Sequence, residues 1–115
     1  MRRGEIRMVD FDPTRGAEAN KSRPAVIVSN DEANATAAQI GRGVLTVVPV
    51  TSNVERVYPF QVLIPSGAGG LPQDSKAQAE QVRSIDAQRV GRLFGTLPPQ
   101  LIASLDDALR LHLAL

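Results

Sequence analysis

Proline and glycine recur at short intervals along this chain and divide its apolar residues into brief runs. The 115 residues include nine glycines and eight prolines. Residues 24–29 and 44–51 form runs rich in β-branched side chains that are too short for a typical helix. Residues 6–11 and 57–64 are further short segments of extended character. The spacing therefore predicts a small, mainly β fold made of brief strands.

Two segments outside these runs have their own signals. Residues 75–85 alternate small or apolar with polar side chains, which favours a strand. After Pro98 and Pro99, apolar residues recur at helical spacing, which predicts a C-terminal helix. His112 lies on the apolar stripe of that helix, so we expect it to pack in the core or at a subunit interface.

Two further positions carry local expectations. Pro49 offers no backbone donor, so the strand at 44–51 should meet an edge or a bulge near this residue. Thr51 and Ser52 would then lie at the open end of the strand. The glycine-rich segment 65–72 lacks the Gly-Lys-Ser/Thr ending of a phosphate-binding loop and is interpreted as a flexible connector.

Composition excludes several kinds of chemistry. The chain has no cysteine and one histidine, which excludes thiol catalysis, disulfides, Cys/His zinc sites and any mechanism with two histidines. The formal net charge is only +1, so a basic site must be local. No apolar run is long enough to cross a membrane, and the first residues do not read as a secretory signal. We expect one cytoplasmic domain over residues 1–115, without metal or cofactor.

Short motifs follow one another in order through most of the chain. They are Arg3-Gly4-Glu5-Ile6, residues 9–18, Arg23-Pro24, Pro49-Val50-Thr51, Tyr58-Pro59-Phe60-Gln61-Val62 and Gln81-Val82-Arg83-Ser84-Ile85. Together they resemble the MazF/PemK family of bacterial toxin endoribonucleases. The resemblance implies an SH3-like β-barrel of the CcdB/PemK-like kind with a C-terminal helix, and a homodimer that cuts single-stranded RNA without metal. It also implies that Arg23 and Thr51 are the central catalytic pair, supported by Glu18 and Gln81.

The chemistry agrees with these residue types, because RNA carries its own nucleophile. A positioned 2′-hydroxyl attacks the adjacent phosphorus once it loses its proton. The fork of donors on Arg23 suits the charge that develops on the non-bridging oxygens. Thr51 and Ser52 are candidates to hold the phosphate. For Glu18, two interpretations stay open: a general base or partner of Arg23, and a simple loop salt bridge.

Substrate binding has fewer candidates. Lys21 belongs to a set of basic residues that can form local positive surface. Phe60 is a candidate for base stacking, although its pattern favours a core position. The basic set is Arg2, Arg3, Arg7, Arg15, Lys21, Arg83, Arg89 and Arg92.

The resulting hypothesis is the toxin of a type II toxin-antitoxin system. It cleaves single-stranded RNA or mRNA to a 2′,3′-cyclic phosphate and a 5′-hydroxyl, and a cognate MazE-like antitoxin inhibits it. Two alternatives stay open: a barrel toxin that binds a protein target such as gyrase, and an inactive homologue that binds RNA or antitoxin only. The gyrase-poisoning relatives act through a tryptophan near the C-terminus, and this chain has none.

Overall fold

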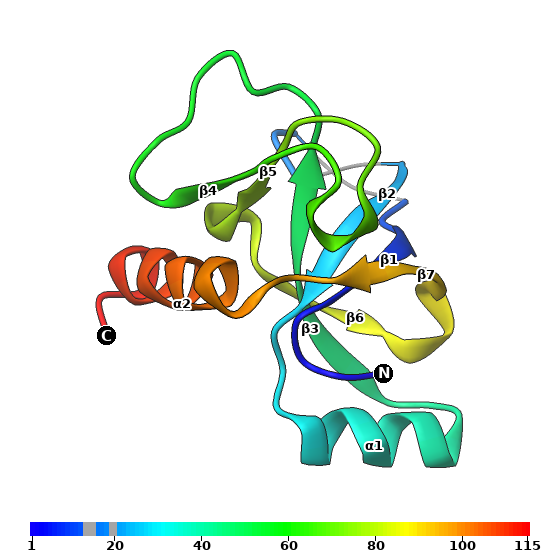
Figure 1. Cartoon of the computed structure of the whole chain (residues 1–115). Helices are drawn as coiled ribbons and strands as arrows, with labels where there is room; N and C mark the ends of the chain where they lie inside the picture. The colour runs from blue at the N-terminus through cyan, green and yellow to red at the C-terminus, as the bar shows by residue number, and fades with distance from the viewer. Residues whose placement is uncertain (13–15, 19–20) are drawn as a thin grey trace.

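The computed structural model describes residues 1–12, 16–18 and 21–115, and Figure 1 shows short strands flanked by helices. The strands are β1 (Glu5–Asp10), β2 (Ser22–Ile27), β3 (Val44–Thr51), β4 (Gln61–Ile64), β5 (Ser75–Gln78), β6 (Arg83–Asp86) and β7 (Val90–Thr96). The helices are α1 (Asp31–Ile40) and α2 (Pro99–Leu113), with 3-10 turns η1 (Ala68–Gly70), η2 (Ala79–Gln81) and η3 (Ala87–Arg89). The predicted mainly β fold with a C-terminal helix is confirmed.

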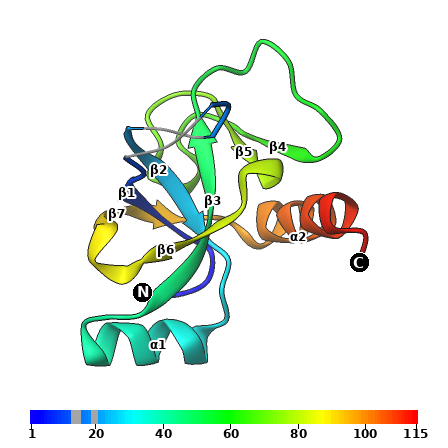
Figure 2. The ribbon, with the colours of Figure 1, turned by 180° about the vertical axis from the view of Figure 1, so that it is seen from behind.

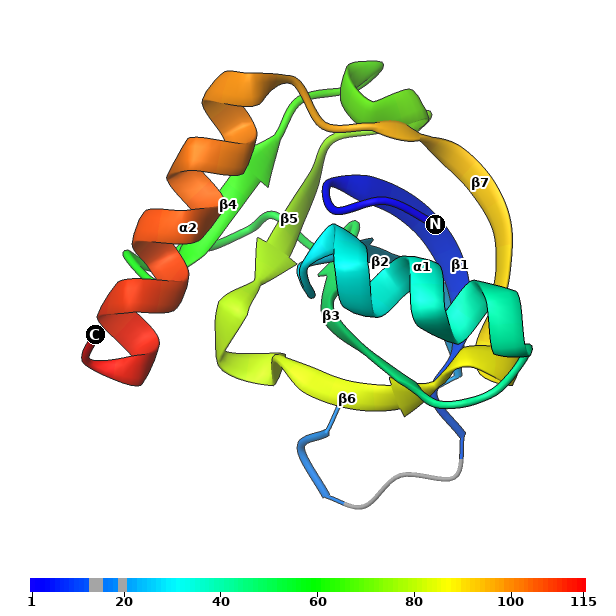
Figure 3. The ribbon, with the colours of Figure 1, turned by 90° about the horizontal axis from the view of Figure 1, so that it is seen from below.

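The strands pair in the order β4-β5-β3-β2-β1-β7, and β6 also pairs with β3. All of these pairs are antiparallel. Figure 3 shows the strands curving around one another, with α2 along one flank and α1 across the near end. Within the described residues no pairing joins β4 to β7, so the strand path is open at this seam and is not a fully closed barrel.

Strand β3 changes partner at Pro49. Its first half pairs with β6 and its last two residues pair with β5, while Ala25 of β2 lies opposite Pro49 on the other side. The missing N–H of proline therefore falls in the gap between two ladders, where no donor is needed. The predicted edge or bulge is not what the structure shows at Pro49, because β3 is a central strand that only changes its partner there.

The two faces of the sheet bury separate apolar clusters, because side chains alternate along each strand. Val26, Val48 and Val50 point into one cluster, which α2 covers through residues such as Leu105. The residues that alternate with them along β2 and β3, such as Val47, point into the other cluster. That second cluster consists of Val9, Phe11, Ala25, Ile27, Val47 and Ile85. Its strands continue beyond these residues into polar positions, and those positions form the site described below.

The glycine-rich segment is not the flexible connector that its composition indicated. Gly69 is buried, and a Cβ on Gly70 would lie 2.0 Å from the carbonyl oxygen of Phe94 in β7. Gly70 also has φ +79°, a conformation that favours glycine. The glycines thus allow backbone to pack against backbone, so the segment closes one side of the core.

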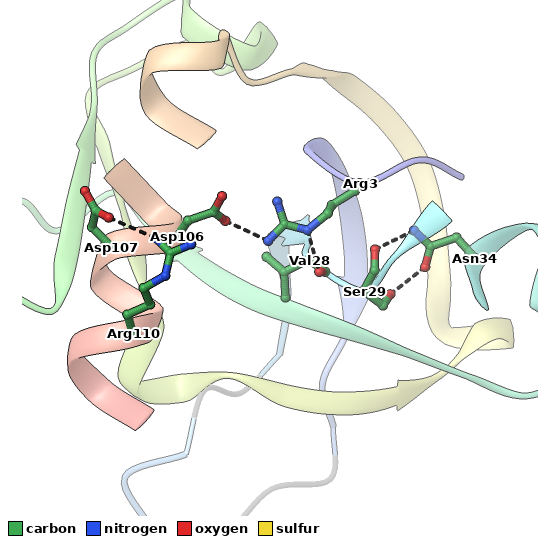
Figure 4. Close-up of polar contacts among 7 residues, drawn as sticks. All are labelled: Arg3, Val28, Ser29, Asn34, Asp106, Asp107 and Arg110. Carbon is green, nitrogen blue, oxygen red and sulfur yellow. Dashed lines mark hydrogen bonds and ion pairs between the residues drawn. The ribbon is translucent and has the colours of Figure 1, made fainter. Parts of the chain in front are cut away.

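Helix α1 was not predicted from the sequence, which indicated one helix at the C-terminus only. Its buried residues are Asn34 and Ala37, so it has no apolar stripe to mark it. Asn30 caps its start by accepting from the Ala33 backbone N–H. Figure 4 shows how Asn34 fastens the helix to the end of β2: its Nδ2 donates to the Ser29 carbonyl at 2.9 Å, and its Oδ1 accepts from the Ser29 hydroxyl.

Helix α2 is joined to the N-terminal segment by Arg3. The Arg3 guanidinium donates to the Val28 carbonyl at 2.8 Å and to Asp106 Oδ1 at 2.7 Å (Figure 4). Of the two settings expected for His112, the core is wrong, because His112 is exposed beyond the buried part of this helix, and a subunit interface stays a prediction. Among the described helices none is long and apolar enough to span a membrane.

The strand boundaries differ from the prediction in the second half of the chain. The expected strand over 75–85 is interrupted by η2, and the expected strand over 57–64 begins only at Gln61. Strand β7 was not predicted. Its residues include exposed Leu93 and two glycines, so its sequence shows no regular alternation that would mark it.

Candidate nucleic-acid site

Arg23 and Thr51, far apart in sequence, are brought to neighbouring strands by the β2–β3 ladder. In this ladder Val26 lies opposite Val48, and Ala25 lies opposite Pro49. Continuing that antiparallel register by two residues places Arg23 opposite Thr51. Directly opposed residues of antiparallel strands present their side chains on the same face. Both residues are half-buried, at the point where the apolar face of the sheet gives way to polar side chains.

The Thr51 hydroxyl is held in place by the chain that follows it. Its Oγ1 accepts from the Asn53 backbone N–H at 3.2 Å. A hydroxyl that accepts in this way still has its own proton to donate. Exposed Ser52 follows directly, and together with Pro24 these residues line a cavity of about 170 Å³. The two hydroxyl residues expected to hold a phosphate therefore open onto a shared hollow.

Gln81 fixes the loop that carries Glu18. Its Nε2 donates to the Ala17 carbonyl at 3.0 Å, which ties η2 to the residues just before Glu18. Glu18 is exposed in this loop. The amide of Gln81 thus has a structural contact in addition to the role in RNA binding that the family resemblance implies. Both interpretations of Glu18 remain predictions.

Lys21 and Phe60 lie in different settings. The Lys21 side chain is exposed just before β2, while its backbone N–H donates to Asp12 Oδ1 at 2.8 Å. Phe60 is half-buried and stacks in parallel on Tyr58, with ring centroids 5.3 Å apart. Tyr58 is the more exposed of the two rings. Arg15 of the predicted basic set lies outside the described residues.

Sequence reasoning did not single out Lys76, which lies opposite Thr51 in the β3–β5 ladder. With the β2–β3 register extended as above, Arg23, Thr51 and Lys76 come from three neighbouring strands at the same level. Lys76 is only 8% exposed, and its Nζ donates to the Arg56 carbonyl at 2.5 Å. No motif marks it in the sequence, because only the pairing of β3 with β5 brings it next to Thr51.

Arg83 adds a further cation near the same face. It lies opposite Val47 in the β3–β6 ladder, and its guanidinium carbon is 5.6 Å from the centre of the Phe11 ring. One of its terminal nitrogens, Nη1, is buried without a hydrogen-bond partner in the described structure. Buried donors are normally satisfied, so this nitrogen is suited to an acceptor from outside the chain.

The arrangement suits a polyanion more than a metal ion. Arg23, Lys76 and Arg83 bring three cations to adjoining strands that also present the hydroxyl of Thr51. No cluster of three or more His, Cys, Asp or Glu that could hold a metal occurs in residues 1–12, 16–18 and 21–115. Guanidinium, ammonium and hydroxyl groups are typical ligands of phosphate oxygens.

Comparison with known proteins agrees with this chemistry. Residues 2–113 match the family described as the PemK-like, MazF-like toxin of type II toxin-antitoxin systems. The chain belongs to this family. Its membership accounts for the ordered motifs between residues 3 and 85.

Three relatives resemble this chain over its full length. It is 62% identical to the endoribonuclease MazF9 of Mycobacterium tuberculosis over 115 residues, which cover 100% of this chain and 98% of that protein. Its fold is similar to MazF from Deinococcus radiodurans, with a TM-score of 0.82, 26% identity and coverage of 100% and 97%. It also resembles a mycobacterial endoribonuclease solved with its cognate antitoxin, with a TM-score of 0.78, 21% identity and coverage of 100% and 96%.

Proposed function

We propose that this chain is the toxin of a type II toxin-antitoxin system and acts as a metal-independent endoribonuclease on single-stranded RNA. The arrangement that carries this proposal is the location of Arg23 and Thr51 on paired strands, each two residues beyond the last β2–β3 pair, Ala25 and Pro49, at the polar end of one sheet face. The relatives named as endoribonucleases favour cleavage over the gyrase-binding alternative.

The reaction follows from the substrate and these two residues. The 2′-oxygen attacks the adjacent phosphorus, a new P–O bond closes the 2′,3′-cyclic phosphate, and the bond to the 5′-oxygen breaks. One proton leaves the 2′-hydroxyl and one is taken up by the 5′-oxygen. Arg23 donates to the non-bridging oxygens as their charge grows, and Thr51 orients the phosphate. Ser52 extends the phosphate contact, and Glu18 acts either as the base or as the partner that aims Arg23.

Binding of the RNA strand extends beyond the cleaved bond. Lys21 contributes positive charge at the entry to β2, Gln81 holds the Glu18 loop against η2, and the Phe60–Tyr58 pair offers a ring surface for a base. The protein works in the cytoplasm as a homodimer. A cognate antitoxin with an acidic, disordered segment inhibits it by covering the same cations.

The cleavage experiment uses defined single-stranded RNAs in EDTA. We expect cleavage that leaves a 5′-hydroxyl and a 2′,3′-cyclic phosphate. A matched RNA with a 2′-deoxy nucleotide on the 5′ side of the cleaved bond should stay intact, because its nucleophile is absent. Cleavage of the deoxy copy would refute this mechanism. Binding of RNA without any cleavage would support the inactive-homologue alternative instead.

The partner proposal has its own experiment. Toxin and antitoxin are purified separately and mixed, and their association is measured at low and high salt. We expect a complex that weakens as salt rises, because salt screens the ion pairs between acidic groups of the partner and the arginine and lysine side chains of the toxin. Failure of the two proteins to associate would remove the antitoxin from the proposal while leaving the nuclease untouched.

A further inference from the structure

Lys76 occupies a position in β5 where a strand of this fold has no structural need for a charge. Residues on both sides of it in the strand, Ser75 and Ala77, are buried, and Leu63 lies opposite it in β4. Lys76 itself is 8% exposed, although lysine is almost never buried unless it is paired. An apolar residue at this place would join the strand without burying a charge.

The environment of the ammonium group is only partly satisfied from within the chain. Nζ donates one of its three protons to the Arg56 carbonyl, and it lies 6.0 Å from the centre of the Tyr58 ring. In the described part of the chain no carboxylate forms an ion pair with it, although Glu55 lines the same hollow. Removing an ammonium from water is costly without a strong partner. The remaining protons are therefore available to an anion.

The geometry also gives an anion access to Lys76. The residue lines an open cavity of about 480 Å³ together with Asn53, Glu55, Arg56 and Tyr58. This cavity begins two residues after Thr51, on the loop that leads from β3 to β4. Thr51 and Lys76 are directly opposed in their ladder, so their side chains start about 5 Å apart on the same face.

We propose that Lys76 is a phosphate-binding residue that holds the RNA phosphate next to the one that is cleaved. Arg23 and Lys76 lie on the strands to either side of Thr51, so the RNA backbone crosses β2, β3 and β5 in turn. Neighbouring strands are about 4.8 Å apart, which places the two cations on either side of the phosphate held at Thr51. This proposal rests on the proposed nuclease function and extends its substrate contact beyond the reacting group.

The test compares wild type with Lys76→Met, which has a similar length and no charge. Affinity is measured with a 2′-deoxy RNA that binds without being cut, over a range of salt concentrations, and kcat and KM are measured with the cleavable RNA. We expect Kd and KM to rise about tenfold, because a hydrogen bond to a charged group is lost. The slope of log K against log salt should become shallower by about 0.7, the value for one phosphate contact on a single strand.

Two further readouts separate this role from a structural one. The kcat of Lys76→Met should stay within about twofold of wild type, because a contact to a non-reacting phosphate binds ground state and transition state alike. The midpoint of thermal unfolding should be equal or higher, because the variant no longer buries a charge. A variant that unfolds earlier and binds RNA with an unchanged salt slope would overturn the proposal.

Arg42→Met is the matched control. Arg42 is exposed before the start of β3, whereas Thr51 lies at the other end of this eight-residue strand. Figures 1 and 2 both show β3 running from the α1 end of the molecule to the end that carries the β3–β4 loop. Loss of this cation should leave the salt slope unchanged. An equal change in both variants would mean that total charge, and not Lys76, sets the affinity, which also overturns the proposal.

A chemical arm works with the wild-type protein alone. The RNA phosphate that neighbours the cleaved one is replaced by a neutral methylphosphonate. Binding of this RNA to the wild-type protein should weaken by about the same tenfold as binding of unmodified RNA to Lys76→Met. Equal affinity for the modified and unmodified RNA would refute the role of Lys76, even if the variant failed to fold. A wild-type chain that does not cleave RNA at all refutes the proposed nuclease function instead, so the two failures are distinguishable.

Discussion

Single residues near the ends of the strands show how one position can combine a structural setting with a chemical role. Arg23 lies directly before Pro24 near the start of β2, and the β1–β2 ladder places it opposite buried Val9. Its half-buried position limits the rotamers of a long side chain, which favours a fixed guanidinium. A fixed fork of donors is what a phosphate with growing charge requires.

Arg23 is therefore the residue whose replacement should affect cleavage most. We expect Arg23→Ala to lower kcat by about 100- to 1000-fold, the range typical of losing one preorganised donor to a developing charge. Arg23→Lys should recover only a small part, because an ammonium cannot make a bidentate contact. Single-turnover cleavage assays measure both, and wild-type rates in Arg23→Ala would remove the residue from the mechanism. Arg42→Ala is a matched control that should leave kcat unchanged, because Arg42 is exposed and precedes β3, whereas Thr51 ends that strand.

Glu5 illustrates a motif residue with a purely structural setting. Burial raises the pKa of its carboxyl, but the hydrogen bond and charge of Arg7 and a backbone hydrogen bond from Arg2 outweigh it, so the pKa is lowered from 4.5. The Arg7 Nε lies 2.9 Å from Glu5 Oε1. A lowered pKa in the folded state means that this carboxylate stabilises the fold above its unfolded pKa.

The pH dependence of unfolding tests this assignment. The stability that Glu5 contributes should be constant above about pH 5.5 and should fall as the pH drops through 4.5 and then through the folded pKa. The difference in unfolding free energy between wild type and Glu5→Gln should therefore shrink below about pH 4.5. Chemical denaturation at several pH values measures it. A difference that stays constant from pH 7 to pH 3 would contradict the lowered pKa.

At the scale of elements, the glycine-rich segment 65–72 determines how β7 meets the rest of the molecule. A Cβ on Gly70 would overlap the Phe94 carbonyl, and a Cβ on Gly95 would lie 2.7 Å from the Gly69 carbonyl oxygen. Composition alone favoured a connector, since glycine permits both flexibility and close packing. The choice between these two depends on what lies beside the segment, which is β7, a strand some twenty residues further along the chain.

Two alanine substitutions in this segment separate backbone conformation from packing. Gly67 and Gly70 have φ of +91° and +79°, but nothing lies within 4 Å of a Cβ at Gly67. Gly67→Ala should cost about 1–2 kcal/mol from its left-handed conformation alone. Gly70→Ala should cost about 1–3 kcal/mol more, because its Cβ would overlap the Phe94 carbonyl. Thermal and chemical unfolding measure both, and equal losses would show that the contact with β7 is unimportant.

At the scale of the whole molecule, exposed leucines gather on the flank formed by α2 and β4. Leu63 and Leu111 are 45% and 58% exposed, and both line a cavity of about 470 Å³ between the helix and the strand. The proposed homodimer needs an apolar surface of this kind, since association between copies is driven largely by burial of apolar area. Within the strand order, β7 lies at the other end of the path from β4.

We therefore expect Leu111→Glu to weaken dimerisation by at least about tenfold, which corresponds to about 1.4 kcal/mol. The reason is the loss of one buried leucine and the introduction of a charge. Sedimentation equilibrium measures the dissociation constant. Leu93→Glu is the matched control, because Leu93 is 48% exposed on β7 and should leave the constant unchanged. A wild-type chain that stays monomeric at high concentration would exclude the dimer.

The sequence by itself determined the class of fold and the family, because both depend on local features. Short β-branched runs, the turn residues between them and the ordered motifs are visible without any contact. Helix α1 shows the limit of this reasoning. It is held by the buried amide of Asn34, which donates to the Ser29 carbonyl, and its sequence has no apolar stripe from which the helix could be predicted.

Only the tertiary structure decided which residues share the site. Arg23, Thr51 and Lys76 come from three strands: the β3–β5 ladder pairs Thr51 with Lys76, and Arg23 lies two residues beyond the last pair of the β2–β3 ladder. A strand's register depends on the side chains and turns of its partners, so no single segment encodes it. For that reason the sequence motifs could point to Arg23 and Thr51 through the family, while Lys76 became visible only when β5 was paired with β3.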